Sequence, residues 1–87
     1  MSKEMFSKEL VSGTDLKNFR KAIGIELDEI FEVTRINVTI LNEIEENDIE
    51  KIPPVIYLKN FLRSYAEILQ MSPERVSEGY ISNMSLL

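Results

Sequence analysis

The most constraining stretch of this sequence is the segment from Val55 to Leu69, VIYLKNFLRSYAEIL, which directly follows Pro53-Pro54. Its apolar residues cover more of a helical wheel than one buried stripe requires. Three aromatic residues within it, Tyr57, Phe61 and Tyr65, recur at a spacing of four. We therefore expect a helix that is either wrapped by the rest of a small domain or presents part of its surface to a partner.

The size and composition of the chain exclude most enzyme classes. Its 87 residues suffice for one domain with a modest core, but not for a core plus a deep catalytic cleft. It contains no cysteine and no histidine, which excludes disulfides, thiolate metal sites, imidazole bases and Ser/His or Cys/His catalytic pairs. We expect a protein that is not an enzyme and that has no cofactor and no bound metal.

Two further absences bear on location. No apolar run approaches the ~18–20 residues that span a bilayer, and the opening MSKEMFSKEL lacks the cationic and apolar regions of a signal peptide. The chain as it stands is therefore predicted to be soluble and cytoplasmic.

Charge is distributed unevenly along the chain. Residues 26–50 carry nine acids against Arg35 alone, a net charge of −8, whereas the flanking segments 15–25 and 51–75 each carry +2. The acids at the end of this segment lack the spacing, central glycine and closing glutamate of a calcium-binding loop. We interpret them as a solvated face: Glu43, Glu45, Glu46, Asp48 and Glu50.

Apolar periodicity predicts an all-α domain over residues 14–84, between a flexible arm at 1–13 and a frayed end at 85–87. Five helices are expected, and no strand pattern is present. Their expected ranges are 14–23, 27–34, 38–45, 55–70 and 73–84.

Punctuating residues support these boundaries. Thr14 or Asp15 can cap the first helix, Gly24 suits its end, Asn37 is a good N-cap, and Ser72 before Pro73 is a start signal. The second and third helices are joined by a turn short enough for a helix-turn-helix unit.

The helix after Pro53-Pro54 divides into two parts. Its inward stripe is predicted to be Leu58, Leu62, Tyr65, Ala66 and Leu69. Tyr57 and Phe61 lie towards the edge of this stripe, where core packing and exposure as partner anchors both remain open. Arg63 either pairs with Glu67 four residues on or joins a binding site, and Lys59 has no such partner.

The order of these features resembles a known family over residues 16–80. The strongest part is LNEIEENDIEKIP at 41–53 followed by VIYLKNFLRSYA at 55–66. In it the chain resembles the five-helix, lambda-repressor-like helix-turn-helix domain at the cytoplasmic N-terminus of RodZ-type bacterial cell-shape proteins.

The resemblance implies a protein-binding adaptor. In the family this domain docks on the actin-like filament protein MreB through aromatic and basic residues of its fourth helix, which match Tyr57, Phe61 and Arg63 here, with Lys59 close by. Family members continue into a transmembrane helix, so a membrane is implied only through sequence outside this chain, at the cytoplasmic face of the inner membrane.

Two departures from the family pattern lead to expectations of their own. Phe31 stands where the family often has alanine, and we expect it to push two helices apart or to fill a void. Glu26 stands where the family has a serine cap, and it is expected to be a poorer cap by ~1 kcal/mol.

The alternative function is DNA binding by a transcriptional regulator. Asn37, Thr39 and Asn42 are the residues of the third helix that can read a base edge. Acidic residues occupy positions that would face the DNA phosphates, so residues 26–50 are expected to repel a duplex. A residual basic route runs over the two flanks: Lys17, Arg20, Lys21, Lys59 and Arg63.

Overall fold

The computed structural model describes residues 11–48 and 50–85. These ranges form five α-helices and contain no strand: α2 (Gly13–Ala22), α3 (Leu27–Thr34), α4 (Val38–Glu45), α5 (Val55–Ile68) and α6 (Pro73–Ser85). The predicted all-α helix-turn-helix class is confirmed, and most helix ends fall within two residues of their expected positions.

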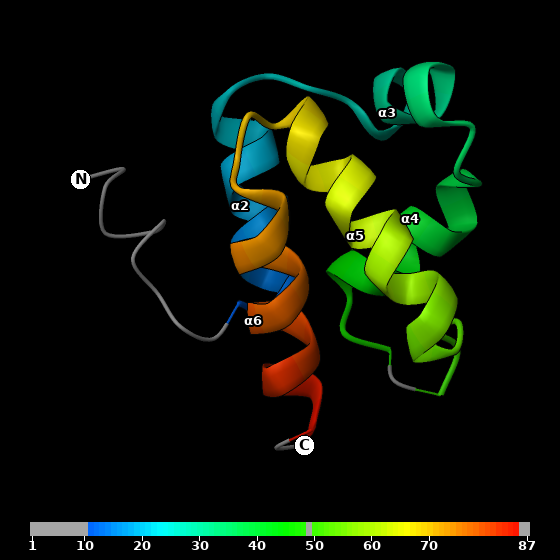
Figure 1. The fold of residues 1–87 in the computed structure, drawn as a ribbon. Coiled ribbons are helices and arrows are strands. Elements are labelled where there is room, and N and C mark those ends of the chain that lie inside the picture. The colour runs from blue at the N-terminus through cyan, green and yellow to red at the C-terminus, as the bar shows by residue number, and fades with distance from the viewer. Residues whose placement is uncertain (1–10, 49, 86–87) are drawn as a thin grey trace.

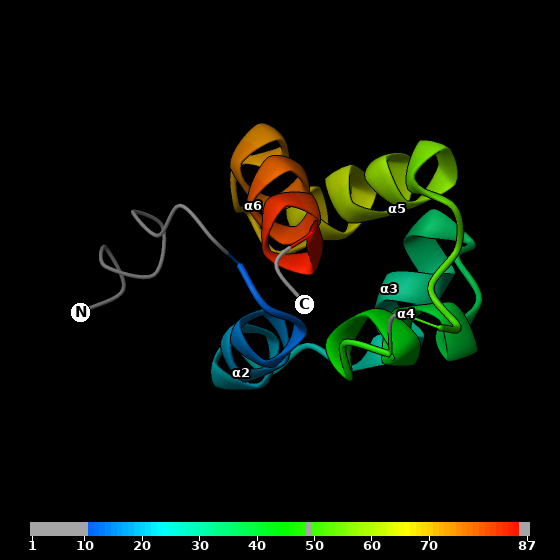
Figure 2. The same ribbon diagram turned by 90° about the horizontal axis from the view of Figure 1, so that it is seen from below.

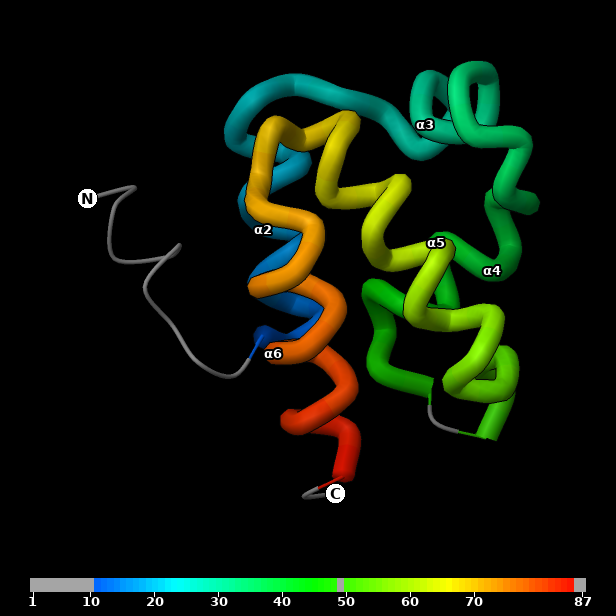
Figure 3. The backbone as a smooth tube through the Cα atoms, viewed as in Figure 1, coloured from blue at the N-terminus to red at the C-terminus, as the bar shows by residue number. Residues whose placement is uncertain are grey.

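The longest helix, α5, organises the packing. It lies between α6 on one side and the α3–α4 pair on the other (Figure 1, Figure 2), and α2 packs against α4. Figure 3 traces how the chain returns along α6 after α5. One face of α5 is therefore covered by its neighbours and the rest is left to solvent.

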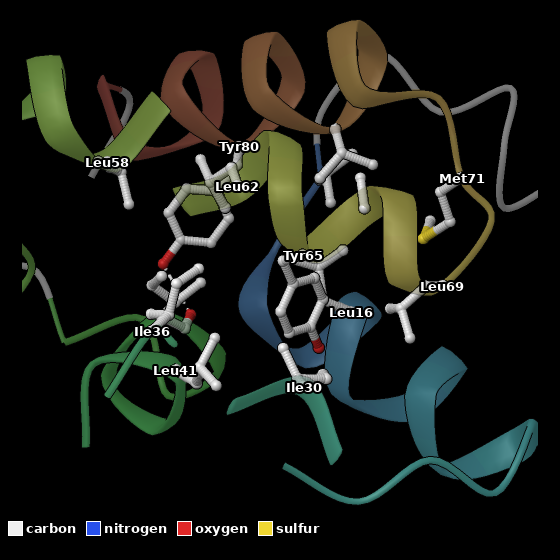
Figure 4. Packing of buried hydrophobic residues seen from close by; sticks show 14 residues of the cluster. Leu16, Ile30, Ile36, Leu41, Leu58, Leu62, Tyr65, Leu69, Met71 and Tyr80 are labelled. Atoms are coloured by element: carbon white, nitrogen blue, oxygen red, sulfur yellow. Dashed lines mark hydrogen bonds between the residues drawn. The ribbon is translucent and has the colours of Figure 1, made fainter. Parts of the chain in front are cut away.

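The hydrophobic core confirms the predicted stripe of α5. Its five residues are all at most 1% exposed, and Figure 4 shows Tyr65 pointing from α5 towards Leu16 and Ile30. Residues from every helix and from the connecting segments complete the core: Val11, Leu16, Ile30, Ile36, Leu41, Ile44, Met71, Val76 and Tyr80.

The start of α2 differs from the prediction. Ser12, not Thr14 or Asp15, is the N-cap: its Oγ accepts from the Asp15 amide at 3.0 Å, and the Asp15 carboxylate accepts from the Ser12 amide at 3.1 Å. This reciprocal capping box satisfies two amides that the first turn would otherwise leave unpaired. The predicted caps Asn37 and Ser72 are confirmed, because their side chains accept from the Thr39 and Arg75 amides.

The predicted arm is also too long at its inner end. Val11 is buried, and its amide donates to the Gly79 carbonyl of α6 at 3.2 Å. Asn83 of α6 donates to the Val11 carbonyl at 3.3 Å. Residues 11–13 therefore belong to the fold, whereas 1–10 lie outside the described residues; at the other end Ser85 closes α6, and 86–87 are likewise outside.

The two departures from the family pattern have local consequences. Phe31 is half-buried, and the Arg35 guanidinium carbon lies 5.5 Å from its ring centroid, so the ring takes part in a cation–π contact and does not fill an internal void. Glu26 is the N-cap of α3, and its amide donates to the Glu29 side chain at 3.0 Å. The Glu29 side chain thus pairs a backbone amide at the start of α3 that would otherwise lack a partner.

Candidate protein-binding surface

The first turn of α5 exposes three consecutive apolar side chains. Val55 is 48% exposed, Ile56 73% and Tyr57 60%. They directly follow Pro54, whose carbonyl accepts from the amides of Tyr57 and Leu58 and so begins the helix. The buried stripe starts at Leu58, so the turn before it projects past the core. We call Val55, Ile56 and Tyr57 the apolar turn.

Helix geometry separates the four predicted site residues into two pairs. Successive residues are about 100° apart around an α-helix, so Tyr57 and Phe61 share one side and Lys59 and Arg63 share another. Residues two apart are about 160° apart, which places these pairs on opposite edges of the buried stripe. We call Tyr57 and Phe61 the aromatic edge and Lys59 and Arg63 the basic edge. The structure does not bring the four together in one ring.

The two aromatic residues differ in accessibility. Tyr57 is largely exposed, whereas Phe61 is half-buried and packs against the core. A ring held from one side by the core keeps a fixed orientation, and the exposed ring one turn earlier offers most of its area to a partner. Tyr57, supported by Phe61, is therefore the accessible part of the aromatic edge, and Ile56, about 100° away around the helix, extends the exposed apolar surface towards the basic edge. Sequence reasoning missed Ile56 because its neighbours suggested only an amphipathic stripe.

The two basic residues differ as well. Arg63 lies 3.7 Å from the Glu74 carboxylate of α6, so its ion pair joins two helices and is not made with Glu67. Both side chains are substantially exposed, and such a pair contributes little to stability. Lys59 is exposed and makes no ion pair within residues 11–48 and 50–85.

The residues considered for DNA reading lie on α4 and its cap. Asn37, Thr39 and Asn42 are exposed, but Oδ1 of the Asn37 side chain accepts from the Thr39 amide at 2.7 Å and is used in capping. The residual basic route loses two of its members. Lys17 pairs with Glu46 at 3.2 Å, and Arg20 is only 5% exposed.

Arg20 is held inside the fold by Glu45, which contradicts its assignment to a basic surface and that of Glu45 to a solvated acidic face. Arg20 Nε and Nη2 donate to the two Glu45 oxygens at 2.7 and 2.9 Å. The Tyr65 hydroxyl donates to the same carboxylate at 2.5 Å, and Arg20 Nη1 donates to the Ile25 carbonyl at 2.8 Å. We call Arg20, Glu45 and Tyr65 the buried polar cluster.

The electrostatics of the buried polar cluster follow from these bonds. The hydrogen bond to Glu45 raises the pKa of Arg20, against the desolvation that lowers it. Burial raises the pKa of Tyr65, and its bond to Glu45 adds to the rise. Sequence reasoning missed the cluster because it treated charge as a sign of exposure. The available signal was spacing: Arg20 and Glu45 each lie four residues after a core leucine, Leu16 and Leu41.

Among the described residues no group of three or more potential metal-ligating side chains comes together. None of their helices has the length and apolar character needed to cross a bilayer.

Comparisons with known proteins agree with this architecture. A model of the helix-turn-helix domain family matches residues 15–76. The chain is 30% identical over 73 residues to an uncharacterised protein of Haemophilus influenzae, covering 83% of this chain and 24% of that protein. It is also 30% identical over 59 residues to the cytoskeleton protein RodZ of Streptococcus pneumoniae, covering 68% of this chain and 21% of that protein.

These matches concern one module, since the chain spans less than a quarter of the length of each of these curated relatives. No solved structure matches. The resemblance to RodZ-type domains stated from the sequence is nevertheless confirmed by the family model and the RodZ match together.

Proposed function

Because the chain belongs to the helix-turn-helix domain family, we propose that it is a non-catalytic, RodZ-type protein-interaction module that docks on an actin-like filament protein, MreB, through the first half of α5. The observation that carries the proposal is the exposure of Ile56 and Tyr57 on a helix whose opposite face is fixed in the core. The module acts in the cytoplasm, and none of its described helices is long and apolar enough to anchor it in the inner membrane.

The proposed mechanism assigns different roles to the two edges of α5. Tyr57 inserts into a partner pocket with Ile56 beside it, because aromatic anchors in desolvated pockets contribute most to protein interfaces. Phe61, one turn further along α5 and packed against the core, limits the motion of the Tyr57 ring. Lys59, across the helix, steers the approach to an acidic partner, and Arg63 contributes less because Glu74 already neutralises it.

The test is co-sedimentation of the purified chain with filaments of MreB from the same bacterium. Tyr57→Ala is expected to weaken binding tenfold or more, since truncation of a central anchor costs about 2 kcal/mol. Lys59→Ala should mainly slow association and reduce its salt dependence.

Val33→Ala is the matched control. Val33 is 69% exposed, but it lies on α3 and not on the apolar turn. It should bind as the unmodified chain does. Equal binding by Tyr57→Ala would exclude the apolar turn as the site, and no sedimentation of the unmodified chain would exclude this partner.

The second candidate function is that of a DNA-binding regulator. The helix-turn-helix family match and the exposure of Thr39 and Asn42 on α4 favour it. The acids that surround these residues oppose it, because they repel the phosphate backbone that supplies most binding energy. We rank it below protein binding for that reason.

A further inference from the structure

The buried polar cluster joins three helices at a single carboxylate, that of Glu45. Glu45 ends α4, Arg20 lies in the last turn of α2, and Tyr65 lies in the second half of α5. Arg20 also binds the Ile25 carbonyl, in the connection between α2 and α3. Within residues 11–48 and 50–85, the bond from Tyr65 to Glu45 is the side-chain hydrogen bond that connects α5 to α4.

Each side-chain nitrogen and oxygen of the cluster has a hydrogen-bond partner. The Glu45 side chain is 0% exposed, and its Oε2 accepts from both Arg20 Nε and Tyr65. Its Oε1 accepts from Arg20 Nη2. No buried side-chain nitrogen or oxygen among the described residues lacks a partner. A guanidinium and a carboxylate bonded by two parallel bonds fix distance and angle together, which apolar contacts do not do.

Stability alone does not account for such a cluster. Removing two charges from water offsets much of their attraction, and apolar side chains of similar volume often stabilise a fold as well or better. Apolar packing fixes the relative orientation of helices less well than hydrogen bonds do, because it tolerates small rotations and shifts between helices.

We propose that the buried polar cluster is a positioning device, which sets the rotation and register of α5 against α2 and α4. Tyr65 is the α5 member, and its hydroxyl holds one orientation of the helix about its own axis. That orientation decides which residues of α5 face solvent, so the cluster acts on Ile56 and Tyr57 from a distance. The inference concerns the free chain and holds whichever molecule α5 binds.

The test replaces the cluster by apolar residues, in the variant Arg20→Met/Glu45→Leu/Tyr65→Phe. We expect it to stay helical by circular dichroism and to unfold in urea at or above the midpoint of the unmodified chain. In ¹H–¹⁵N NMR spectra the α5 amides should broaden or double, because α5 then samples more than one packing. A single sharp set of α5 resonances at the original chemical shifts would overturn the proposal.

A matched control exists between the same two helices. Lys17 of α2 and Glu46 at the end of α4 form an exposed ion pair, and Lys17→Met/Glu46→Leu should leave the α5 resonances unchanged. Broadening of α5 in this control to the same extent as in the triple variant would also contradict a specific role of the buried polar cluster.

Tyr65→Phe decides the matter should the triple variant fail to fold. It removes only the α5 bond and leaves both oxygens of Glu45 bound to Arg20. Amide hydrogen exchange should then accelerate in α5 more than in α2 and α4. An equal acceleration in all three helices would show that the hydroxyl serves global stability alone, and would overturn the proposal.

Discussion

Gly13 lies where the ends of two helices, α2 and α4, meet. A Cβ atom at this position would lie 2.1 Å from the Ile44 carbonyl oxygen and 2.5 Å from that of Glu45. The Gly13 amide donates to the Asn47 side chain at 2.8 Å, just beyond the end of α4. The N-terminus of α2 therefore abuts the C-terminus of α4, an arrangement in which the two helix dipoles attract each other.

We predict that Gly13→Ala destabilises the fold by about 3 kcal/mol, because backbone must move to admit the methyl group. Gly24→Ala is the matched control: Gly24 has a φ of 77°, but nothing lies within 4 Å of its Cβ position. It should cost only the strain of a left-handed residue, roughly 1–2 kcal/mol. Urea unfolding of both variants checks this, and a larger loss for Gly24→Ala would contradict it.

Two buried tyrosines predict a loss of stability at alkaline pH. Burial raises the pKa of Tyr65 and of Tyr80, and Tyr65 is raised further by Glu45. An unfolded chain therefore releases these protons first, at about pH 10. Their contribution to the free energy of unfolding is fully present below that pH and declines above it by about 1.4 kcal/mol per pH unit for each group.

The measurement is urea unfolding between about pH 9 and pH 11. This range extends about one unit to either side of the pKa of tyrosine in an unfolded chain. Tyr80→Phe removes one of the two groups, so the stability of that variant should fall less steeply with pH. Lysine deprotonation affects both proteins alike. If the free energy of unfolding fell with pH at the same rate in both proteins, the pKa of Tyr80 would be the same in the folded and unfolded chains, and the prediction would be wrong.

At the scale of elements, α2 to α5 share one way of ending. Each is followed within two residues by a residue with positive φ: Gly24 at 77°, Arg35 at 63°, Asn47 at 57° and Gln70 at 60°. This left-handed residue stops the helix and turns the chain. Glycine adopts it without strain, and asparagine tolerates it, but arginine and glutamine do so at a cost.

Gln70→Gly is therefore predicted to stabilise the chain by up to about 1 kcal/mol. The change relieves the strain of a left-handed residue, and the greater entropy of glycine in the unfolded chain offsets part of this gain. Arg35→Gly should gain less, since it also removes the cation–π contact with Phe31. Thermal unfolding of the two variants compares them. A lower midpoint for Gln70→Gly than for the unmodified chain would refute the strain argument.

At the scale of the whole molecule, the charge of the chain bears on the DNA-binding alternative. The chain carries −5 overall, and three of the five basic residues proposed for a DNA route form ion pairs: Arg20 with Glu45, Lys17 with Glu46 and Arg63 with Glu74. We predict no mobility shift with random duplex DNA at low salt, the condition that most favours phosphate contacts. Lys59→Glu is the comparison on the basic edge. A tight, salt-sensitive shift that this change abolished would instead support the regulator.

Much of the fold was predictable because its signals are local. Periodicity gave the five helices, and the stripe of α5 followed from its spacing. The cap of α2 was not predictable, because Ser12, Thr14 and Asp15 are all capable and the packing of Val11 under α6 favours the first.

The candidate site was only partly predictable. The sequence left open whether Tyr57 is exposed, and its grouping with Lys59 ignored that residues two apart face away from each other on a helix. The exposure of Ile56 depends on where the core ends, which is a tertiary property. The partnership of Arg20 with Glu45 spans 25 positions, so no local pattern could connect them.

The division of α5 has a consequence for how this protein can change over generations. The side chains that hold the helix in the core and those that face solvent in its first turn are different residues. Under the proposed function, substitutions at Ile56 or Tyr57 would alter what the helix binds while the fold stays intact, and substitutions at Leu58 or Leu62 would disturb the core whatever the partner. On that proposal, partner choice and folding depend on separate sets of positions, so a new binding preference can evolve without passing through a sequence that does not fold.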